Sequence, residues 1–66
     1  MNLTINGDIQ TVAEELTLAA LLQKLTGTNR GSAAAVDGEV IPRSEWPTYR
    51  LQDGQVVEVL TAVQGG

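Results

Sequence analysis

The C-terminal residues Gln64-Gly65-Gly66 offer the most distinctive chemistry in this chain. The sequence contains no cysteine and no histidine, so it has no thiolate nucleophile, no imidazole base and no ordinary zinc site. The α-carboxylate of Gly66 is ionised at neutral pH and resists nucleophilic attack, because it has no adequate leaving group. If this carboxylate attacked the α-phosphate of ATP, the resulting acyl-adenylate could be displaced by a sulfur or nitrogen nucleophile. We therefore predict Gly66 as the reactive residue.

The last three residues also have the shape that such chemistry requires. Residues without a Cβ form a thin, pliable segment, and three extended residues reach on the order of 10 Å. A tail of residues 64–66 could therefore enter a narrow active site of another protein, with Gln64 and Gly65 giving access to Gly66. The alternative is a frayed terminus without a function, as most chain ends are.

The chain is expected to bind no cofactor of its own. Residues 27–32 are rich in glycine, but they follow a predicted helix and lack the Lys followed by Ser or Thr of a phosphate-binding loop. We interpret them as a solvated connector. ATP and magnesium are then expected to be used by a partner adenylating enzyme, for which this chain is a co-substrate and not a catalyst.

Length and charge limit the other functions. The chain has 66 residues and a formal net charge of -4, and its pI is near 4.3. It is expected to form one small domain, to repel nucleic acid and anionic membranes, and to prefer basic protein surfaces. No apolar run approaches the roughly 20 residues that span a bilayer. The N-terminus lacks the features of a secretory signal, so a cytoplasmic location is expected.

Three dipeptides, Asn6-Gly7, Asp37-Gly38 and Asp53-Gly54, predict tight hairpin turns, because their residues tolerate positive φ. The residues around the turns have the composition and alternation of strands. The predicted strands comprise residues 3–6 and 9–13, which form an N-terminal hairpin, and residues 33–36, 39–41 and 56–63. Residues 43–47 are interpreted as either a further strand or an irregular segment.

Leucines at positions 18, 21, 22 and 25 form the apolar stripe of one helix. Thr17 is predicted to cap the start of this helix and Gly27 to end it. The alternative is an earlier start at Thr11, which has capping-box spacing to Glu14. We favour the later start, because it leaves residues 9–13 free to pair with the first strand.

These elements predict an α+β fold in which a mixed sheet of four or five strands packs on one helix. Residues 1–63 form the domain and residues 64–66 a flexible tail. The strand of residues 56–63 is apolar on both alternating faces, which is typical of a central strand and places it beside the first strand.

If Val57, Val59 and Val63 face the helix, then Val56, Leu60 and Ala62 lie on the opposite face of the sheet, although the two faces could be reversed. With only one helix, that opposite face would be uncovered and could dock the adenylating enzyme. The acidic residues that would steer this encounter from the rim are Glu58, Asp53 and Glu45.

Two further residues have more than one interpretation. Trp46 either closes the small core beside Pro42 and Pro47 or contacts a partner directly. Arg43 either pairs with Glu45, or donates to a backbone carbonyl, or engages a partner.

Three stretches of the sequence resemble the ThiS family of thiamin-pathway sulfur carriers: EVIPRSEW at residues 39–46, LQDGQVVE at residues 51–58 and TAVQGG at residues 61–66. The resemblance implies a ubiquitin-like β-grasp fold. It also implies that a ThiF-type adenylating enzyme forms acyl-AMP at Gly66. Sulfur from a persulfide-bearing donor protein then gives a thiocarboxylate, and thiazole synthase accepts the sulfur.

Alternative functions remain open at this stage. The same carrier chemistry could deliver sulfur to molybdopterin or to an amino-acid precursor. A ubiquitin-like modifier would instead be joined through Gly66 to lysines of target proteins. An interaction module with an inert tail would use neither reaction.

Overall fold

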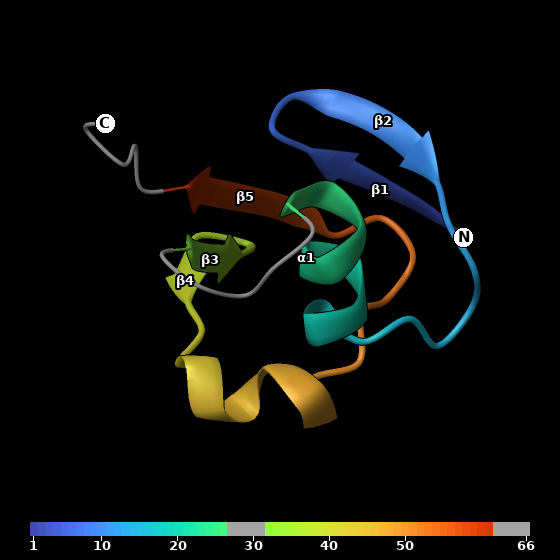
Figure 1. Cartoon of the computed structure of the whole chain (residues 1–66). Coiled ribbons are helices and arrows are strands. Elements are labelled where there is room, and N and C mark those ends of the chain that lie inside the picture. The colour runs from blue at the N-terminus through green and yellow to red at the C-terminus, as the bar shows by residue number, and fades with distance from the viewer. Residues whose placement is uncertain (27–31, 62–66) are drawn as a thin grey trace.

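In the described part of the chain, five strands form one mixed sheet in the order β2-β1-β5-β3-β4, and helix α1 packs on one face of it (Figure 1). The computed structural model describes residues 1–26 and 32–61. Within these residues, the α+β fold with four or five strands on one helix is confirmed. The elements are β1 (Asn2–Ile5), β2 (Asp8–Thr11), α1 (Leu18–Thr26), β3 (Ser32–Val36), β4 (Glu39–Val40), the 3₁₀ helix η1 (Arg43–Thr48) and β5 (Val56–Thr61).

Two of the three predicted turn dipeptides close hairpins. Asn6 and Gly7 have φ of 49° and 88° and join the antiparallel strands β1 and β2. Asp37 and Gly38 have φ of 51° and 84° and join β3 to β4. Positive φ at both central residues gives a turn whose twist matches that of the flanking strands. The N-terminal hairpin is therefore confirmed.

The third dipeptide, Asp53-Gly54, forms no hairpin, so this prediction was wrong. Only Gly54 has a positive φ, of 86°, and Gln55 N–H donates to the Gln52 carbonyl at 3.2 Å, as in a type II turn. Gly54 N–H also donates to the Asn2 carbonyl at 2.8 Å, and Asn2 N–H donates to Asp53 Oδ1 at 2.6 Å. The turn therefore fastens the chain to β1 immediately before β5 begins.

Helix α1 begins where the later of the two predicted starts placed it. Ala20 N–H donates to Thr17 Oγ1 at 3.2 Å, which confirms Thr17 as the N-cap. The earlier start at Thr11 is wrong, because Thr11 pairs with Asn2 in the hairpin. The predicted end at Gly27 lies outside the described residues. Of the predicted leucine stripe, Leu18, Leu21 and Leu22 are buried in the core, whereas Leu25 is 41% exposed, so the stripe prediction is wrong for this last residue.

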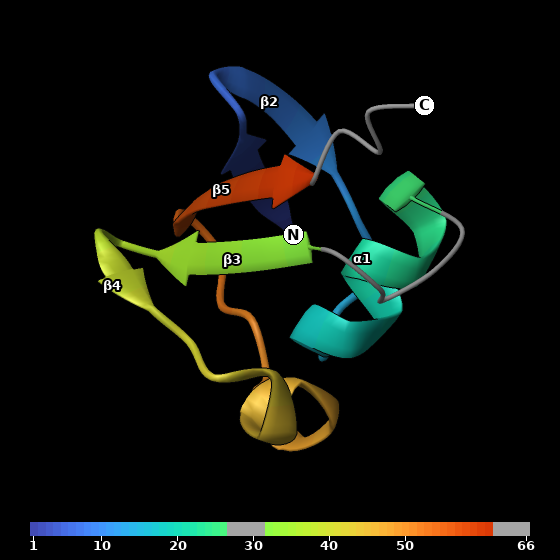
Figure 2. The ribbon, with the colours of Figure 1, turned by 60° about the vertical axis from the view of Figure 1, so that its left-hand side comes forward.

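Strand β5 is the central strand, as its apolar sequence predicted. It pairs parallel with β1 and antiparallel with β3, so the last strand lies beside the first (Figure 2). The predicted strand ended at Val63, and its last two residues lie outside the described part of the chain.

Residues 43–47 fold as part of the 3₁₀ helix η1, so the strand interpretation was wrong. Glu45 N–H donates to the Pro42 carbonyl at 2.9 Å, which is the three-residue spacing of a 3₁₀ helix. Pro42 and Pro47 fix φ near −65°, which suits this helix better than a strand. Strand β4 ends at Val40 rather than at Ile41, whose side chain turns into the core.

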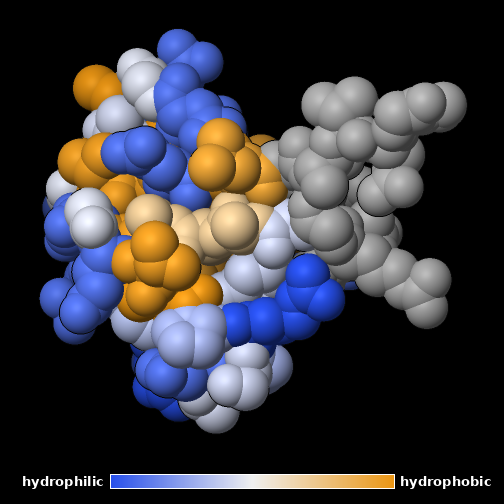
Figure 3. Space-filling view, turned by 90° about the vertical axis from the view of Figure 1, so that its left-hand side faces the viewer, coloured by the Kyte–Doolittle hydropathy of each residue, from blue (hydrophilic) through white to orange (hydrophobic). Residues whose placement is uncertain are grey.

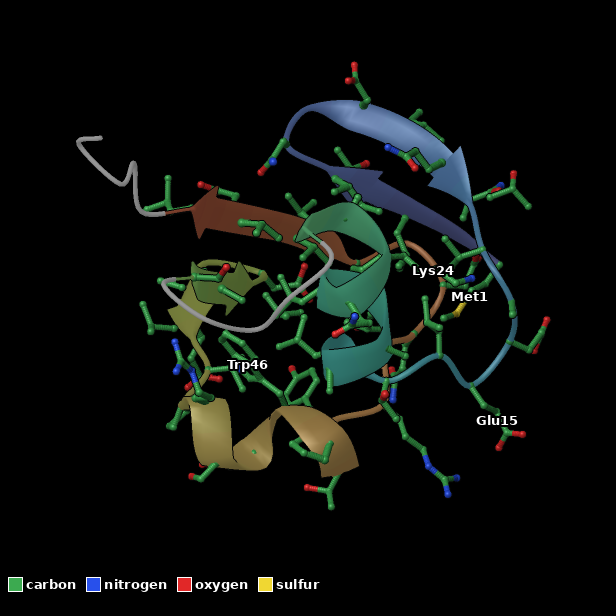
Figure 4. All side chains as sticks on the ribbon, in the orientation of Figure 1. Met1, Glu15, Lys24 and Trp46 are labelled. Atoms are coloured by element: carbon green, nitrogen blue, oxygen red, sulfur yellow. The ribbon has the colours of Figure 1, made fainter. Side chains whose placement is uncertain are left out.

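The core lies between the sheet, α1 and η1, and Trp46 is the largest of its fully buried side chains (Figure 4). The indole is 2% exposed, and its Nε1 donates to the Ile41 carbonyl at 2.9 Å. Trp46 therefore closes the core and has no surface left for a partner. The buried apolar residues are Leu3, Ile5, Leu16, Leu18, Leu21, Leu22, Ala34, Val36, Ile41, Trp46, Leu51, Val57 and Val59.

Across residues 1–26 and 32–61, no helix is long and apolar enough to cross a membrane.

Replacing Trp46 by Phe should lower the free energy of unfolding by about 1–3 kcal/mol, because the buried Ile41 carbonyl loses its donor. Urea unfolding followed by circular dichroism measures this change. The control Ser44→Ala, at an exposed position on the same 3₁₀ helix, should stay within about 0.5 kcal/mol of the parent chain. Equal stability of the Trp46→Phe variant and the control would contradict a structural role for the indole bond.

Candidate functional site

In the described part of the chain, exposed apolar side chains gather on the face of the sheet opposite α1, part of which Figure 3 shows. On β5, Val57 and Val59 are buried, whereas Val56 and Leu60 are 42% and 73% exposed. The predicted face assignment is thus confirmed for these four residues. Ala62 and Val63, which completed the two predicted sets, lie outside the described residues.

Neighbouring strands extend this outer face. Ala33 lies opposite Leu60 in the register, and Ala35 lies opposite both Glu58 and Val40. Val40 is 72% exposed. These residues, with Ala34, line a shallow hollow of about 80 Å³ whose walls are apolar except for Glu58. We refer to Val56, Leu60, Val40, Ala33 and Ala35 as the outer patch. It is large enough to receive an apolar side chain of another molecule.

The predicted acidic rim is only partly assembled around this patch. Glu58 is exposed and borders the hollow. Asp53 lies in the turn before β5, at the opposite end of that strand from the tail, and its carboxylate is bonded to Asn2 N–H. Glu45 is exposed on η1. Glu58 is therefore the acidic residue that the structure places in the patch.

Arg43 adopts the second of its three predicted interactions. Its Nη2 donates to the Ser32 carbonyl at 3.4 Å, and its Cζ lies 5.5 Å from the centroid of the Trp46 ring. Among the described residues, the ion pair recorded is Arg50 with Glu15, at 3.3 Å, and Arg43 is not paired with Glu45. Because Ser32 lies opposite Thr61 in the sheet, the guanidinium is near the end of β5. The sheet thus carries a positive charge close to the base of the tail.

The turn residues Asn6 and Asp37 hold β5 from both sides, a role that the sequence analysis missed. Val59 N–H donates to Asn6 Oδ1 at 2.9 Å, and Asn6 N–H donates to the Val57 carbonyl at 2.9 Å. On the other side, Val56 N–H donates to Asp37 Oδ1 at 2.9 Å, and Asp37 N–H donates to the Val56 carbonyl at 2.8 Å. Each side chain acts as a backbone carbonyl where a neighbouring strand has turned away.

A second concavity, open and of about 570 Å³, lies at the other end of the molecule. Met1, Glu14, Glu15 and Arg50 are among its lining residues, and Figure 4 shows Met1 and Glu15 far from the tip of β5. The Arg50 and Glu15 charges pair with each other across it. This concavity is therefore separate from the outer patch and the tail.

The predicted reactive tail, Gln64, Gly65 and Gly66, lies outside the described residues. The last described residue before it is Thr61, at the end of β5. Within the described part of the chain, no group of three or more acidic, histidine or cysteine side chains is placed to hold a metal ion.

Comparison with known proteins identifies the family. A sequence model of the ThiS family matches residues 3–66. The crystal structure of the thiamine biosynthesis protein ThiS from Geobacter metallireducens has a TM-score of 0.84 and 36% sequence identity to this chain, with 100% of both chains covered. The chain belongs to the ThiS family. The ubiquitin-like β-grasp fold implied by the resemblance is thereby confirmed.

Two curated relatives complete this comparison. The sulfur carrier protein ThiS of Escherichia coli K12 is 27% identical over 66 residues, which is 100% of both chains. A protein named thiazole synthase from Paramagnetospirillum magneticum is 30% identical over 66 residues, which is all of this chain but only 20% of that protein. The ThiS-family chain is accordingly a sulfur carrier of thiamin biosynthesis and not a catalyst.

Replacing Asn6 by Gly should speed hydrogen exchange of the Val59 amide by roughly tenfold, because its acceptor is lost at a cost of about 1–2 kcal/mol. Glycine is chosen because it tolerates the positive φ of this position. Asn6→Asp keeps an oxygen acceptor and should exchange at close to the parent rate. NMR-detected exchange measures both variants, with the Leu60 amide as the internal reference. Equal Val59 rates in the two variants would show that the Asn6 side chain does not hold β5.

Proposed function

We propose that this ThiS-family chain carries sulfur as a thiocarboxylate on Gly66 and donates it to thiazole formation. The observation that carries the proposal is the family match over residues 3–66, which includes the terminal Gly65-Gly66. The fold supports it, because β5 is held in the centre of the sheet and leads directly toward these residues.

The first step activates the carboxylate. An oxygen of the Gly66 carboxylate attacks the α-phosphorus of ATP, so that an acyl–oxygen–phosphorus bond forms. The bond from the α-phosphorus to the bridging oxygen breaks, and pyrophosphate leaves with the electron pair. The acyl carbon then carries AMP, which is a good leaving group.

The second step replaces oxygen by sulfur. The terminal sulfur of a persulfide on a donor protein attacks the acyl carbon, and AMP leaves, which gives an acyl disulfide between the carrier and the donor. A thiol then attacks the donor's sulfur atom in this disulfide. The thiocarboxylate leaves as the reduced product, and the donor and the attacking thiol are joined in a new disulfide.

A ThiF-type adenylating enzyme is the proposed partner for activation, and it supplies ATP, magnesium and the catalytic groups. The carrier sequence has no cysteine, histidine or phosphate-binding loop with which to perform these steps. The carrier and its partners are proposed to meet in the cytoplasm.

The outer patch is the proposed docking surface for the adenylating enzyme. Val56 and Leu60 provide its exposed apolar side chains on β5, the strand that leads to the tail. Glu58 provides a negative charge beside them and Arg43 a positive charge near the end of β5. Ala62 is proposed to extend the same surface. A partner with an apolar centre and charges complementary to Glu58 and Arg43 would fit this pattern.

Thiazole synthase is the proposed acceptor of the sulfur. In Paramagnetospirillum magneticum, a protein named thiazole synthase contains a segment similar to this whole chain, over 20% of its length. The presence of a segment similar to this chain within a protein of that name supports direct transfer of sulfur from the carrier to a thiazole synthase. This favours thiazole formation over molybdopterin, an amino-acid precursor or protein conjugation as the destination of Gly66.

Incubation of the chain with its adenylating enzyme, ATP, magnesium and a persulfide donor should raise the intact mass by the difference between a sulfur and an oxygen atom. Mass spectrometry of the whole protein measures this change. Deletion of Gly66 should abolish the change, because the reactive carboxylate would then belong to Gly65 and fall one residue short. The proposal fails if the full-length chain never acquires AMP or sulfur under these conditions.

Replacing Leu60 by Ser should raise the KM of the adenylating enzyme for the carrier about tenfold, a loss of about 1.4 kcal/mol of docking free energy, while kcat changes little. The matched control is Leu25→Ser, because Leu25 is also an exposed leucine, at 41%, but lies on α1. Pyrophosphate release at varied carrier concentration gives both constants. An equal KM for the two variants would remove the outer patch as the docking surface.

A further inference from the structure

The sheet has a gap beside the C-terminal half of β5. Strand β1 pairs with β5 only at Thr4 with Val56 and at Ile5 with Val57. After Ile5 the chain turns at Asn6 and Gly7 into β2, whereas β5 continues to Thr61 (Figure 1). On the other side, β3 pairs with β5 from Val57 as far as the pair of Ser32 and Thr61. The end of β5 is therefore a central strand on one side and an edge strand on the other.

The recorded hydrogen bonds show which backbone groups face this gap. The Val56 carbonyl accepts from Asp37 N–H on the β3 side, and the Val57 carbonyl accepts from Asn6 N–H on the β1 side. Because successive residues of a strand direct their backbone groups to opposite sides, Val59 and Thr61 also face the β1 side. Residues 58 and 60 face β3, where the ladder is complete.

The first position in the gap is filled by a side chain. Asn6 Oδ1 accepts from Val59 N–H at 2.9 Å, in the place where a longer β1 would have put a backbone carbonyl. No strand among residues 1–26 and 32–61 pairs with β5 on this side beyond that bond. The Val59 carbonyl and the Thr61 N–H thus form an acceptor and a donor directed to the same edge, which is the spacing that an added strand uses.

We propose that this edge, the Val59 carbonyl and the Thr61 N–H, pairs with an extended segment of the adenylating enzyme. The inference rests on the proposed activation of Gly66 and specifies how the enzyme holds the residues that precede it. The enzyme segment joins the sheet as a short strand in the position that β1 leaves open.

The chemistry of the tail makes backbone pairing the suitable mode of recognition. Gly65 and Gly66 have no side chains for an enzyme to grip, so their position must be set through backbone groups. A hydrogen-bonded pair that begins on the ordered strand fixes the direction and register of the residues that follow. Leu60, 73% exposed on the outer face between the two facing residues, adds an apolar contact beside the added strand.

The test replaces Thr61 by Pro, which removes the N–H on the gap side and places the ring there. This change leaves the β3 ladder intact, because residues 58 and 60 carry it, and Leu60 is already extended as a residue before proline must be. Thr61→Ala is the matched control, since it alters the side chain but keeps the N–H. We expect the KM for the carrier in ATP-dependent pyrophosphate release to rise at least tenfold with Thr61→Pro and less than twofold with Thr61→Ala. Equal values for the two variants would overturn the inference.

A second measurement uses the parent chain and needs no substitution. Hydrogen exchange at the Thr61 amide should slow at least tenfold when the adenylating enzyme is added without ATP, because the amide gains an acceptor. The Leu60 amide, which faces β3, serves as the reference and should change much less. A Thr61 amide that exchanges at the same rate in the complex as in the free carrier would also overturn the inference.

The two proposals fail in different ways. If the parent chain is never adenylated, the proposed function itself is wrong. If the parent chain is adenylated and Thr61→Pro reacts with unchanged KM, only the pairing at the β5 edge is wrong. Unchanged exchange of the Leu60 and Ala33 amides in the Thr61→Pro variant confirms that the variant keeps its sheet.

Discussion

The structure depends on β5 being held on both sides in the centre of the sheet. Its inner side chains, Val57 and Val59, are buried against the core, and complete burial of a valine contributes about 1.5–3 kcal/mol. Each neighbour leaves part of β5 unpaired: β1 offers two paired residues, and β3 ends at Val36, opposite Val57, where the chain turns toward β4. Asn6 and Asp37 extend the pairing with side-chain oxygens, so β5 keeps its backbone bonds at positions where the partner backbone has already turned away. The tail therefore begins from a fixed strand.

A core without disulfides must be closed efficiently in so short a chain. The 3₁₀ helix η1 does this by burying Trp46 in the core with α1 and the sheet. The indole Nε1, its one polar side-chain atom, donates to the Ile41 carbonyl. Pro42, immediately before η1, and Pro47, within it, reduce the freedom of the unfolded chain at little cost to the folded one. The same segment carries Arg43, whose guanidinium lies over the Trp46 ring and donates to the Ser32 carbonyl. Because Ser32 pairs with Thr61, Arg43 connects η1 to the part of the sheet where β5 ends.

Much of the fold could be predicted from local patterns in the sequence. Two of the hairpin turns, the Thr17 cap, three buried leucines of α1 and the central, two-faced β5 each follow from residue types a few positions apart, and each is present in the structure. The failures concern long-range contacts. The turn at Asp53 and Gly54 is set by bonds to Asn2, which lies 51 residues before Asp53 in the sequence, and η1 is set by burial of Trp46. The hydrogen bonds that the Asn6 and Asp37 side chains accept from β5 depend on the strand register, which the sequence does not specify.

The two edges of β5 differ near the last described residues of the strand. Along β3 the strand is paired to its last described residue, so the departure point of the tail is fixed. On the β1 side the backbone pairing ends at Val57. The side chain of Asn6 adds one further bond, in which its Oδ1 accepts from the Val59 N–H. A sheet complete on both sides would offer a partner only side chains, and the terminal glycines have none. An edge left open next to the tail instead offers backbone groups, which recognise an extended segment whatever its sequence. The shortness of β1 is thus a functional feature, because lengthening it would bury the groups by which an enzyme can locate the tail.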